Sequence, residues 1–174
     1  MDIASKLTAA AEQLFDRHGY TATGMDRLTD AAGVSSRTLY KHAGSKAALM
    51  ARVLTERDRR FMARLEVRTV AALFDALEDW VRVEGCRGCL FLRTRAETGG
   101  DTPEIAKAVA LHKEAFQARI AEVVAIDLGR EDPALAEQVL ILFEGATQAA
   151  VYRGPETVAA ARAAAVHLLE RARA

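Results

Sequence analysis

The sequence predicts an all-α protein. Helix is favoured along nearly the whole chain, because 36 of the 174 residues are alanine and alternating β-branched residues are scarce. Pro103, Pro133 and Pro155 each stand where a first helical turn is expected to begin, a position that tolerates the missing N–H. We therefore expect about nine helices and no strand, in a chain long enough for one ordinary domain or for a small head on a larger body.

Apolar residues recur at helical spacing and mark seven of these helices in order. Glycines follow several of the stripes, as at Gly19, Gly33, Gly85 and Gly129, and glycine commonly ends a helix. Two further short helices are expected near residues 36–42 and 88–98. The seven stripes, from the N-terminus, are Ile3, Leu7, Ala10, Leu14 and Phe15; Met25, Leu28 and Ala32; Met50, Val53, Leu54, Phe61 and Leu65; Val70, Leu73, Phe74, Leu77 and Val81; Ile105, Val109, His112, Phe116, Ile120 and Val123; Leu135, Val139, Leu142, Phe143 and Ala146; and Val158, Ala165, Leu168 and Leu169.

The charge pattern excludes several classes of protein. Basic and acidic residues both number 24, whereas a protein that coats nucleic acid by bulk charge carries a large positive excess. No apolar run reaches the roughly 18 residues of a membrane span. No signal-peptide pattern opens the chain, and two cysteines do not build a disulfide scaffold, so we expect a cytoplasmic protein that does not bind a membrane. Residues 1–65 carry 11 basic and 7 acidic side chains, while residues 66–174 carry 13 and 17, which suggests that the first part meets an anionic partner.

Residues 21–46 are predicted to form two short helices joined by a tight turn. Thr23 precedes the first of them as an N-cap, with Asp26 three residues later in the position of a capping-box partner. The first helix ends at Ala31-Ala32-Gly33, where the alanines let a second helix approach closely and the glycine permits a left-handed backbone. This arrangement is a helix-turn-helix.

The second short helix presents polar and aromatic side chains. Ser35 or Ser36 caps it, and Leu39 faces inward. An arginine can donate two hydrogen bonds to the acceptors of guanine, and a threonine offers a hydroxyl and a methyl group. Tyrosine, lysine and histidine reach phosphates. Side chains of these types are the ones that recognise a DNA major groove. Lys46, with the amides that open the following helix, would form an anion site. The alternative is a plain αα-hairpin with a polar surface. The side chains expected to be exposed are Ser36, Arg37, Thr38, Tyr40, Lys41 and His42.

These residues belong to a longer pattern. Its parts are Phe15-Asp16-Arg17-His18-Gly19-Tyr20, Thr23, Ala31-Ala32-Gly33-Val34-Ser35, Thr38-Leu39-Tyr40-Lys41-His42 and Ser45-Lys46-Ala47-Ala48-Leu49. The pattern closely resembles the DNA-binding head of TetR-family transcriptional regulators, over about residues 3–54 and with order and spacing intact. Two positions depart from it. Ala43 stands where the family usually has an aromatic residue, and Thr29 stands where a small apolar residue is common.

The resemblance implies a homodimeric regulator of transcription that binds double-stranded operator DNA, most often a repressor released by a small-molecule effector. Residues 1–46 would be the helix-turn-helix DNA-binding domain and residues 47–174 the ligand-sensing and dimerisation domain. The last two helices would form the dimer interface. The residues assigned to DNA contacts are Thr23, Ser35, Ser36, Arg37, Thr38, Tyr40, Lys41, His42 and Lys46.

The helix expected over residues 133–152 also points to a dimer. Its stretch 139–143 is apolar all round and needs burial on both sides. Its stretch 145–150 is small enough for close helix approach, and the alanine-rich helix 156–172 would complete a four-helix interface across a two-fold axis. The alternative is a helix buried wholly inside one monomer. The expected interface residues are Leu135, Val139, Leu142, Phe143, Ala146, Ala150, Ala165 and Leu168.

A pocket between the middle helices is the expected effector site. Its candidate lining residues are Trp80, Phe91, Arg95, His112 and Phe116. Each has a second interpretation. His112 lies on an apolar stripe, where a histidine is more often a satisfied core residue than a ligand, and Trp80 and Phe116 are more often ordinary core.

Cys86 and Cys89 form a CxxC motif near a helix N-terminus, where thiol pKa values can fall. A redox-responsive regulator is therefore an alternative. No second CxxC and no nearby histidine cluster completes a zinc site, so we expect no metal. Cys89 also fits the segment Gly88-Cys89-Leu90-Phe91, which with Glu97 resembles a sub-group of the same regulators.

Catalytic motifs are missing from the sequence. There is no HExxH, GxSxG, glycine-rich phosphate loop or carboxylate cluster at metal spacing, so we expect neither an enzyme nor a bound cofactor. A helical adaptor whose head binds protein is a further alternative, and it would be indifferent to the loss of Arg37.

Overall fold

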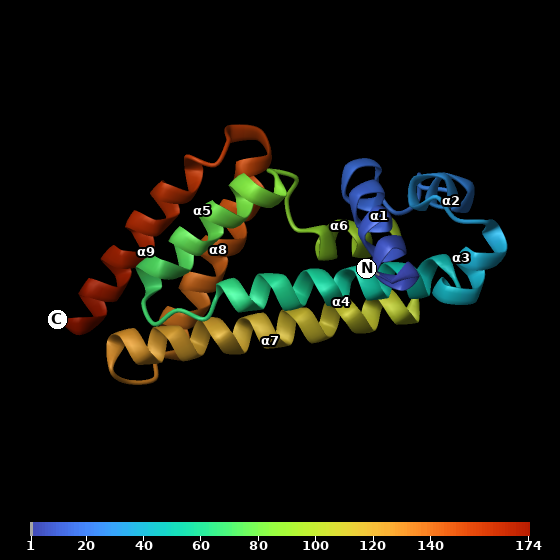
Figure 1. Cartoon of the computed structure of the whole chain (residues 1–174). Helices are drawn as coiled ribbons and strands as arrows, with labels where there is room; N and C mark the ends of the chain where they lie inside the picture. Colours follow the sequence, from blue (N-terminus) through green and yellow to red (C-terminus); the bar gives the residue numbers. More distant parts are fainter. Residues whose placement is uncertain (1) are drawn as a thin grey trace. The chain divides into compact units, whose positions relative to one another are not determined.

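A computed structural model describes residues 2–174 and shows nine α-helices and no strand in that range (Figure 1). The predicted fold class and number of helices are therefore confirmed. None of the helices in residues 2–174 is long and apolar enough to cross a membrane. In chain order they are α1 (Ile3–His18), α2 (Met25–Ala32), α3 (Ser36–Ala43), α4 (Lys46–Arg64), α5 (Val70–Glu84), α6 (Leu90–Glu97), α7 (Pro103–Leu128), α8 (Pro133–Arg153) and α9 (Thr157–Arg173).

The helices divide between two compact units. The first unit contains the described residues up to Arg59 together with Leu90–His112, and the second contains Arg60–Cys89 and Lys113–Ala174. Two helices, α4 and α7, therefore begin in the first unit and end in the second. The predicted DNA-binding domain, residues 1–46, falls within the first unit, which also takes in most of α4, all of α6 and the start of α7.

In the first unit, α1, α2 and α3 pack against one another. Asp2 caps α1 by accepting a hydrogen bond from the Ser5 N–H at 2.7 Å, which satisfies one of the free amides of the first turn. The core of this three-helix head is apolar and fully buried, with Leu7, Phe15 and Leu28 at its centre. Burial of this kind is the main source of stability for helices as short as α2 and α3.

In the second unit, α5, α8 and α9 pack together with the later part of α7. Asp132 caps α8 by accepting from the Leu135 N–H at 3.0 Å, directly before Pro133 at the first helical position. The Asp127 carboxylate at the end of α7 accepts from the Val70 N–H at 2.6 Å and from Arg173 at 2.7 Å, so it holds the start of α5 and the end of α9.

Aromatic rings fill the middle of the second unit. Phe61 lies 5.2 Å from Trp80 and 5.6 Å from Phe116, in edge-to-face contacts measured between ring centroids. Phe143 joins the same cluster at 5.1 Å from Phe116, and Phe74 lies 5.7 Å from Phe143. These contacts place Trp80 and Phe116 in the packed core of this unit.

Candidate nucleic-acid interface

A glycine and a serine set the direction of α3. Gly33, at the end of α2, has a left-handed backbone with φ of +63°, and the Val34 N–H donates to a carbonyl in the last turn of α2 at 3.1 Å. Ser35 Oγ then accepts a hydrogen bond from the Thr38 N–H at 3.2 Å. Of the two serines that the sequence offered as caps, Ser35 is therefore the N-cap and Ser36 is the first residue of the helix.

One face of α3 is buried and the other is open. Leu39 is fully buried, Ala43 is nearly so, and together they anchor the helix to the core of the first unit. Tyr40, on the other face, exposes 53% of its surface. A large aromatic side chain this exposed on a two-turn helix is available to a partner. Of the predicted contact residues on and before α3, those exposed are Ser35, Ser36, Arg37, Tyr40 and Lys41, while Thr38 and His42 are half-buried.

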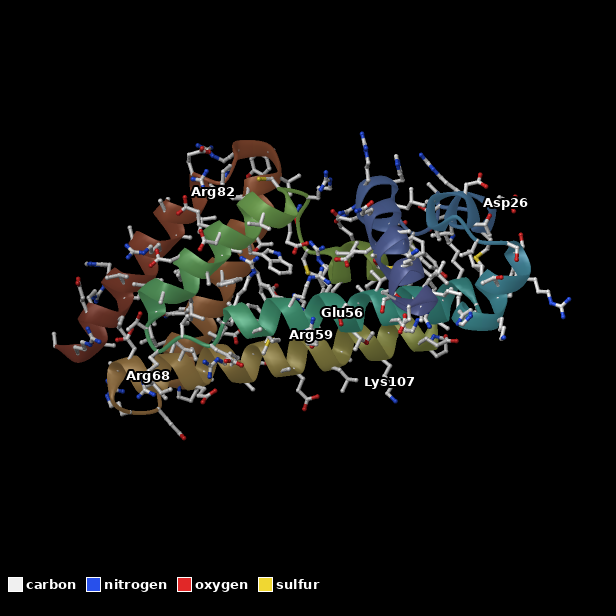
Figure 2. All side chains as sticks on the ribbon, viewed as in Figure 1. Asp26, Glu56, Arg59, Arg68, Arg82 and Lys107 are labelled. Carbon is white, nitrogen blue, oxygen red and sulfur yellow. The ribbon has the colours of Figure 1, made fainter. Side chains whose placement is uncertain are left out.

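The structure corrects the assignment of Thr23. Its side chain is 0% exposed, and its hydroxyl donates to the Gly19 carbonyl at 2.7 Å. The N-cap of α2 is instead Gly24, which offers no side-chain hydrogen bond. Thr23 therefore neither caps the helix nor reaches DNA. Its hydrogen bond stabilises the turn after α1 from inside the fold. Asp26, in the first turn of α2, is exposed (Figure 2).

Lys46, predicted to contact phosphate, lies at the start of α4 and turns toward the loop between α1 and α2. Its ammonium donates to the Thr21 carbonyl at 3.3 Å and lies 4.4 Å from the centre of the Tyr20 ring. Partial burial lowers the pKa of Lys46 from its ordinary value, and the nearby Glu97 charge acts in the opposite direction. Ser45 Oγ accepts from the Ala48 N–H at 3.0 Å, so the cap of α4 already uses one of the amides of the expected anion site.

The same loop is held by α6, a feature that sequence reasoning missed. Arg93 donates to the Asp16 carbonyl at 2.8 Å and to its carboxylate at 3.1 Å. Glu97 accepts from the Thr21 N–H at 2.7 Å. Gly19 has φ of +87°, a backbone conformation that favours glycine, and a Cβ there would lie 2.9 and 3.0 Å from the Glu97 carboxylate oxygens, so the Glu97 side chain would have to shift. These partners lie more than 70 residues apart in the chain, and no local pattern signals such pairs.

The five candidate effector residues are divided between the two units. In the first unit, the His112 ring stacks on Phe91 with centroids 3.7 Å apart, and His112 Nδ1 lies 2.6 Å from a carboxylate oxygen of Asp58. Arg95 is exposed. In the second unit, Trp80 and Phe116 belong to the aromatic cluster described above. A hollow of about 670 Å³ in the second unit includes none of the five; it is lined by Ala121, Glu122, Ala125, Ile126, Glu131, Asp132, Pro133 and Ala136.

The face of α8 available to a partner differs from the one expected. Leu142 and Leu168 are half-buried, and the other six expected interface residues are buried within the core of the second unit. One side of the uniformly apolar stretch of α8 packs on the chain's own core, and Ile141 on the other side is left 61% exposed. The exposed residues on α8 are Pro133, Ala134, Glu137, Gln138, Ile141, Gly145, Gln148, Val151, Tyr152 and Arg153, and those on α9 include Ala159, Ala160, Ala163, Ala164 and His167.

Cys86 and Cys89 are free, half-buried thiols in the segment between α5 and α6. Cys86 packs against the core of the second unit, and its sulfur lies 4.0 Å from the Val81 carbonyl. Gly88 between them has φ of +76°, and a Cβ there would lie 3.0 Å from the Gln148 side-chain oxygen. The segment is thus closely packed on α8.

Comparison with known proteins agrees with this architecture. The family described as bacterial regulatory proteins, tetR family, matches residues 7–53. The crystal structure of SCO4454, a TetR-family transcriptional regulator from Streptomyces coelicolor, superposes with a TM-score of 0.89 at 26% identity and covers 99% of this chain and 96% of that one. Residues 7–53 thus match the tetR family of bacterial regulatory proteins, and the chain as a whole has the fold of a TetR-family transcriptional regulator.

Curated relatives in sequence match shorter parts. The transcriptional activator FasR of Mycolicibacterium smegmatis is 47% identical over 49 residues, which is 28% of this chain and 22% of that protein. The transcriptional repressor BdcR of Escherichia coli is 32% identical over 97 residues, 48% of this chain and 48% of that protein. The chain therefore covers at most about half the length of these relatives, one of which is named an activator and the other a repressor.

The departures from the TetR-family pattern have different consequences in the structure. The Thr29 hydroxyl donates to the Asp26 carbonyl at 2.6 Å, which satisfies the polar group that the substitution buries. Ala43 is buried at the end of α3 and contributes only a methyl group there.

Proposed function

We propose that this chain is a sequence-specific DNA-binding transcriptional regulator, acting as a homodimeric repressor that a small-molecule effector releases from its operator. The observation that carries the proposal is the exposed face of α3. Arg37, Tyr40 and Lys41 project from a capped two-turn helix whose opposite face is anchored by Leu39. A short helix with fixed direction and exposed donors is what insertion into a major groove requires.

The side chains of α3 divide into two roles in this proposal. Arg37, in the first turn, reads a base edge, because its planar fork matches the two acceptors of guanine. Tyr40 and Lys41 contact phosphates and so position the helix without reading sequence. Lys41 also places a positive charge in the last turn, where it complements the helix dipole.

Arg37→Ala is expected to weaken binding to the preferred DNA site by about 1–3 kcal/mol while leaving binding to random duplex nearly unchanged. The reason is that the variant loses a base contact and keeps the phosphate contacts. Fluorescence anisotropy against a site selected from a random DNA pool, beside a scrambled duplex, measures both affinities.

Lys41→Ala is the matched control, because it removes one positive charge from the same helix. It is expected to weaken binding to both duplexes alike and to lower the slope of log K against log salt by about one. An Arg37→Ala variant that loses affinity for both duplexes equally would contradict a base-reading role for Arg37.

The exposed face of α8 and α9 supports a homodimer. Ile141 and Tyr152 are large, exposed apolar side chains on α8, and the exposed alanines of α9 permit close helix contact. A two-fold axis through this face would present two copies of α3 to half-sites one helical turn or more apart on a palindromic operator.

Ile141→Glu is expected to convert the dimer to a monomer at micromolar concentration, because it places a charge at the centre of the apolar face. Light scattering coupled to size exclusion measures the mass. Ile126→Glu is the control, since Ile126 is an exposed isoleucine that belongs to α7 and not to α8 or α9. If Ile141→Glu keeps the mass of a dimer, a different surface holds the two copies together.

Effector release requires a ligand that favours one conformation of the protein over the other. The contacts of α6 support a path by which a ligand-induced shift would reach the three-helix head formed by α1, α2 and α3. Helix α6 follows Cys89 directly in the chain. Arg93 and Glu97 hold the end of α1 and the loop before α2, so a shift of α6 would move the elements that support α3.

A further inference from the structure

The C-terminal end of α3 is held by an arginine of α4. Two of its last carbonyls are satisfied locally: Tyr40 O accepts from the Gly44 N–H at 2.9 Å and Ala43 O from the Ser45 N–H at 3.0 Å. In the same turn, His42 O accepts from Arg52 Nη1 at 2.6 Å. Arg52 thus caps the helix from outside, and its positive charge lies at the negative end of the α3 dipole.

This cap carries an energetic cost. Arg52 is half-buried, and its Nε and Nη2 atoms are fully buried with no hydrogen-bond partner in the part of the chain that the structure describes. A guanidinium stays charged, so these N–H groups lose their water without replacement. A residue that bonds one carbonyl and leaves two buried donors unpaired is poorly explained by stability alone.

We propose that Arg52 is a positioning residue for DNA recognition, which rests on the proposed function. By holding His42 O from α4, it fixes the direction of α3 and hence the places of Arg37 and Tyr40. The helix has only eight residues, so a displacement of its C-terminal end tilts its whole length. Bidentate reading of a base tolerates little misplacement. Arg52 does not contact DNA in this proposal, because its guanidinium is turned into the protein.

Arg52→Met tests the proposal, because methionine has similar length and removes both the charge and the donors. We expect about tenfold weaker binding to the selected DNA site, with unchanged affinity for random duplex and an unchanged salt slope. The melting temperature should not fall, because the two unpaired donors are removed with the cap. Arg52→Lys, which keeps a charged donor, should recover part of the discrimination. Arg59→Met is the matched control, because Arg59 lies on the surface of α4 with a side chain 69% exposed and paired with Glu56 (Figure 2).

Two results would overturn the proposal. If Arg52→Met binds the selected site as the parent chain does, Arg52 does not position α3. If it weakens binding to both duplexes and lowers the salt slope by about one, Arg52 contacts phosphate instead. A parent chain that selects no DNA sequence is a separate outcome and overturns the proposed function itself.

A measurement on the free protein tests the cap without DNA. Hydrogen exchange at the Gly44 and Ser45 amides should become several-fold faster in Arg52→Met than in the parent chain, because the end of α3 frays when the cap is lost. Equal exchange rates in the two proteins would overturn the positioning role, whatever the DNA result.

Discussion

Leu39→Ala is expected to lower the free energy of unfolding of the first unit by about 2–5 kcal/mol. Leu39 is fully buried, and it is the main apolar anchor of α3, a helix too short to be stable alone. The truncation leaves a cavity between α3 and the rest of the three-helix head. Chemical denaturation followed by circular dichroism measures the loss, and DNA binding should be lost with it.

Tyr40→Ala is the neighbouring control, because Tyr40 is exposed on the opposite side of the same helix. It should change the free energy of unfolding by less than about 0.5 kcal/mol and yet weaken DNA binding. If both variants lose stability to the same extent, the exposed face of α3 contributes to the fold and is not reserved for a partner.

Phe143→Ala is expected to destabilise the second unit by about 3–5 kcal/mol. The Phe143 ring lies between Phe116, Phe74 and Phe61, with centroids 5.1, 5.7 and 6.1 Å away. Removing it deletes three ring contacts and opens a cavity at the centre of the unit. Thermal unfolding monitored by calorimetry measures the change.

Ile141→Ala separates the two faces of α8, because Ile141 and Phe143 are two residues apart and point in different directions from the helix. We expect Ile141→Ala to weaken the dimer with little effect on the core. A Phe143→Ala variant that stays as stable as the parent chain but becomes monomeric would instead place Phe143 at the interface, as the sequence pattern suggested.

Helical periodicity indicated seven of the nine helices, because each of these helices buries one side along its apolar stripe. The limit of such patterns is clear on α8. A stretch that is apolar all round indicates burial but does not say against what. In the structure, Val139 and Phe143 face the chain's own core and Ile141 faces solvent, so six of the eight interface residues expected from the pattern belong to the core.

The candidate site shows the same division between local and long-range information. Exposure of Arg37, Tyr40 and Lys41 follows from the spacing around Leu39, and the sequence predicted it. Thr23 was misassigned because a threonine before a helix resembles a cap, whereas its hydroxyl bonds back to Gly19. The contacts of Arg93 with Asp16 depend on tertiary packing, which no local pattern records.

The measurement that tests the central claim most directly is anisotropy of the full chain on a DNA site selected from a random pool, across a salt series. The account predicts selection of a palindromic site, tight and salt-sensitive binding, and a clear preference over a scrambled duplex that Arg37→Ala reduces. Equal, weak binding to the selected and scrambled duplexes, unaffected by Arg37→Ala, would contradict the claim that α3 reads DNA.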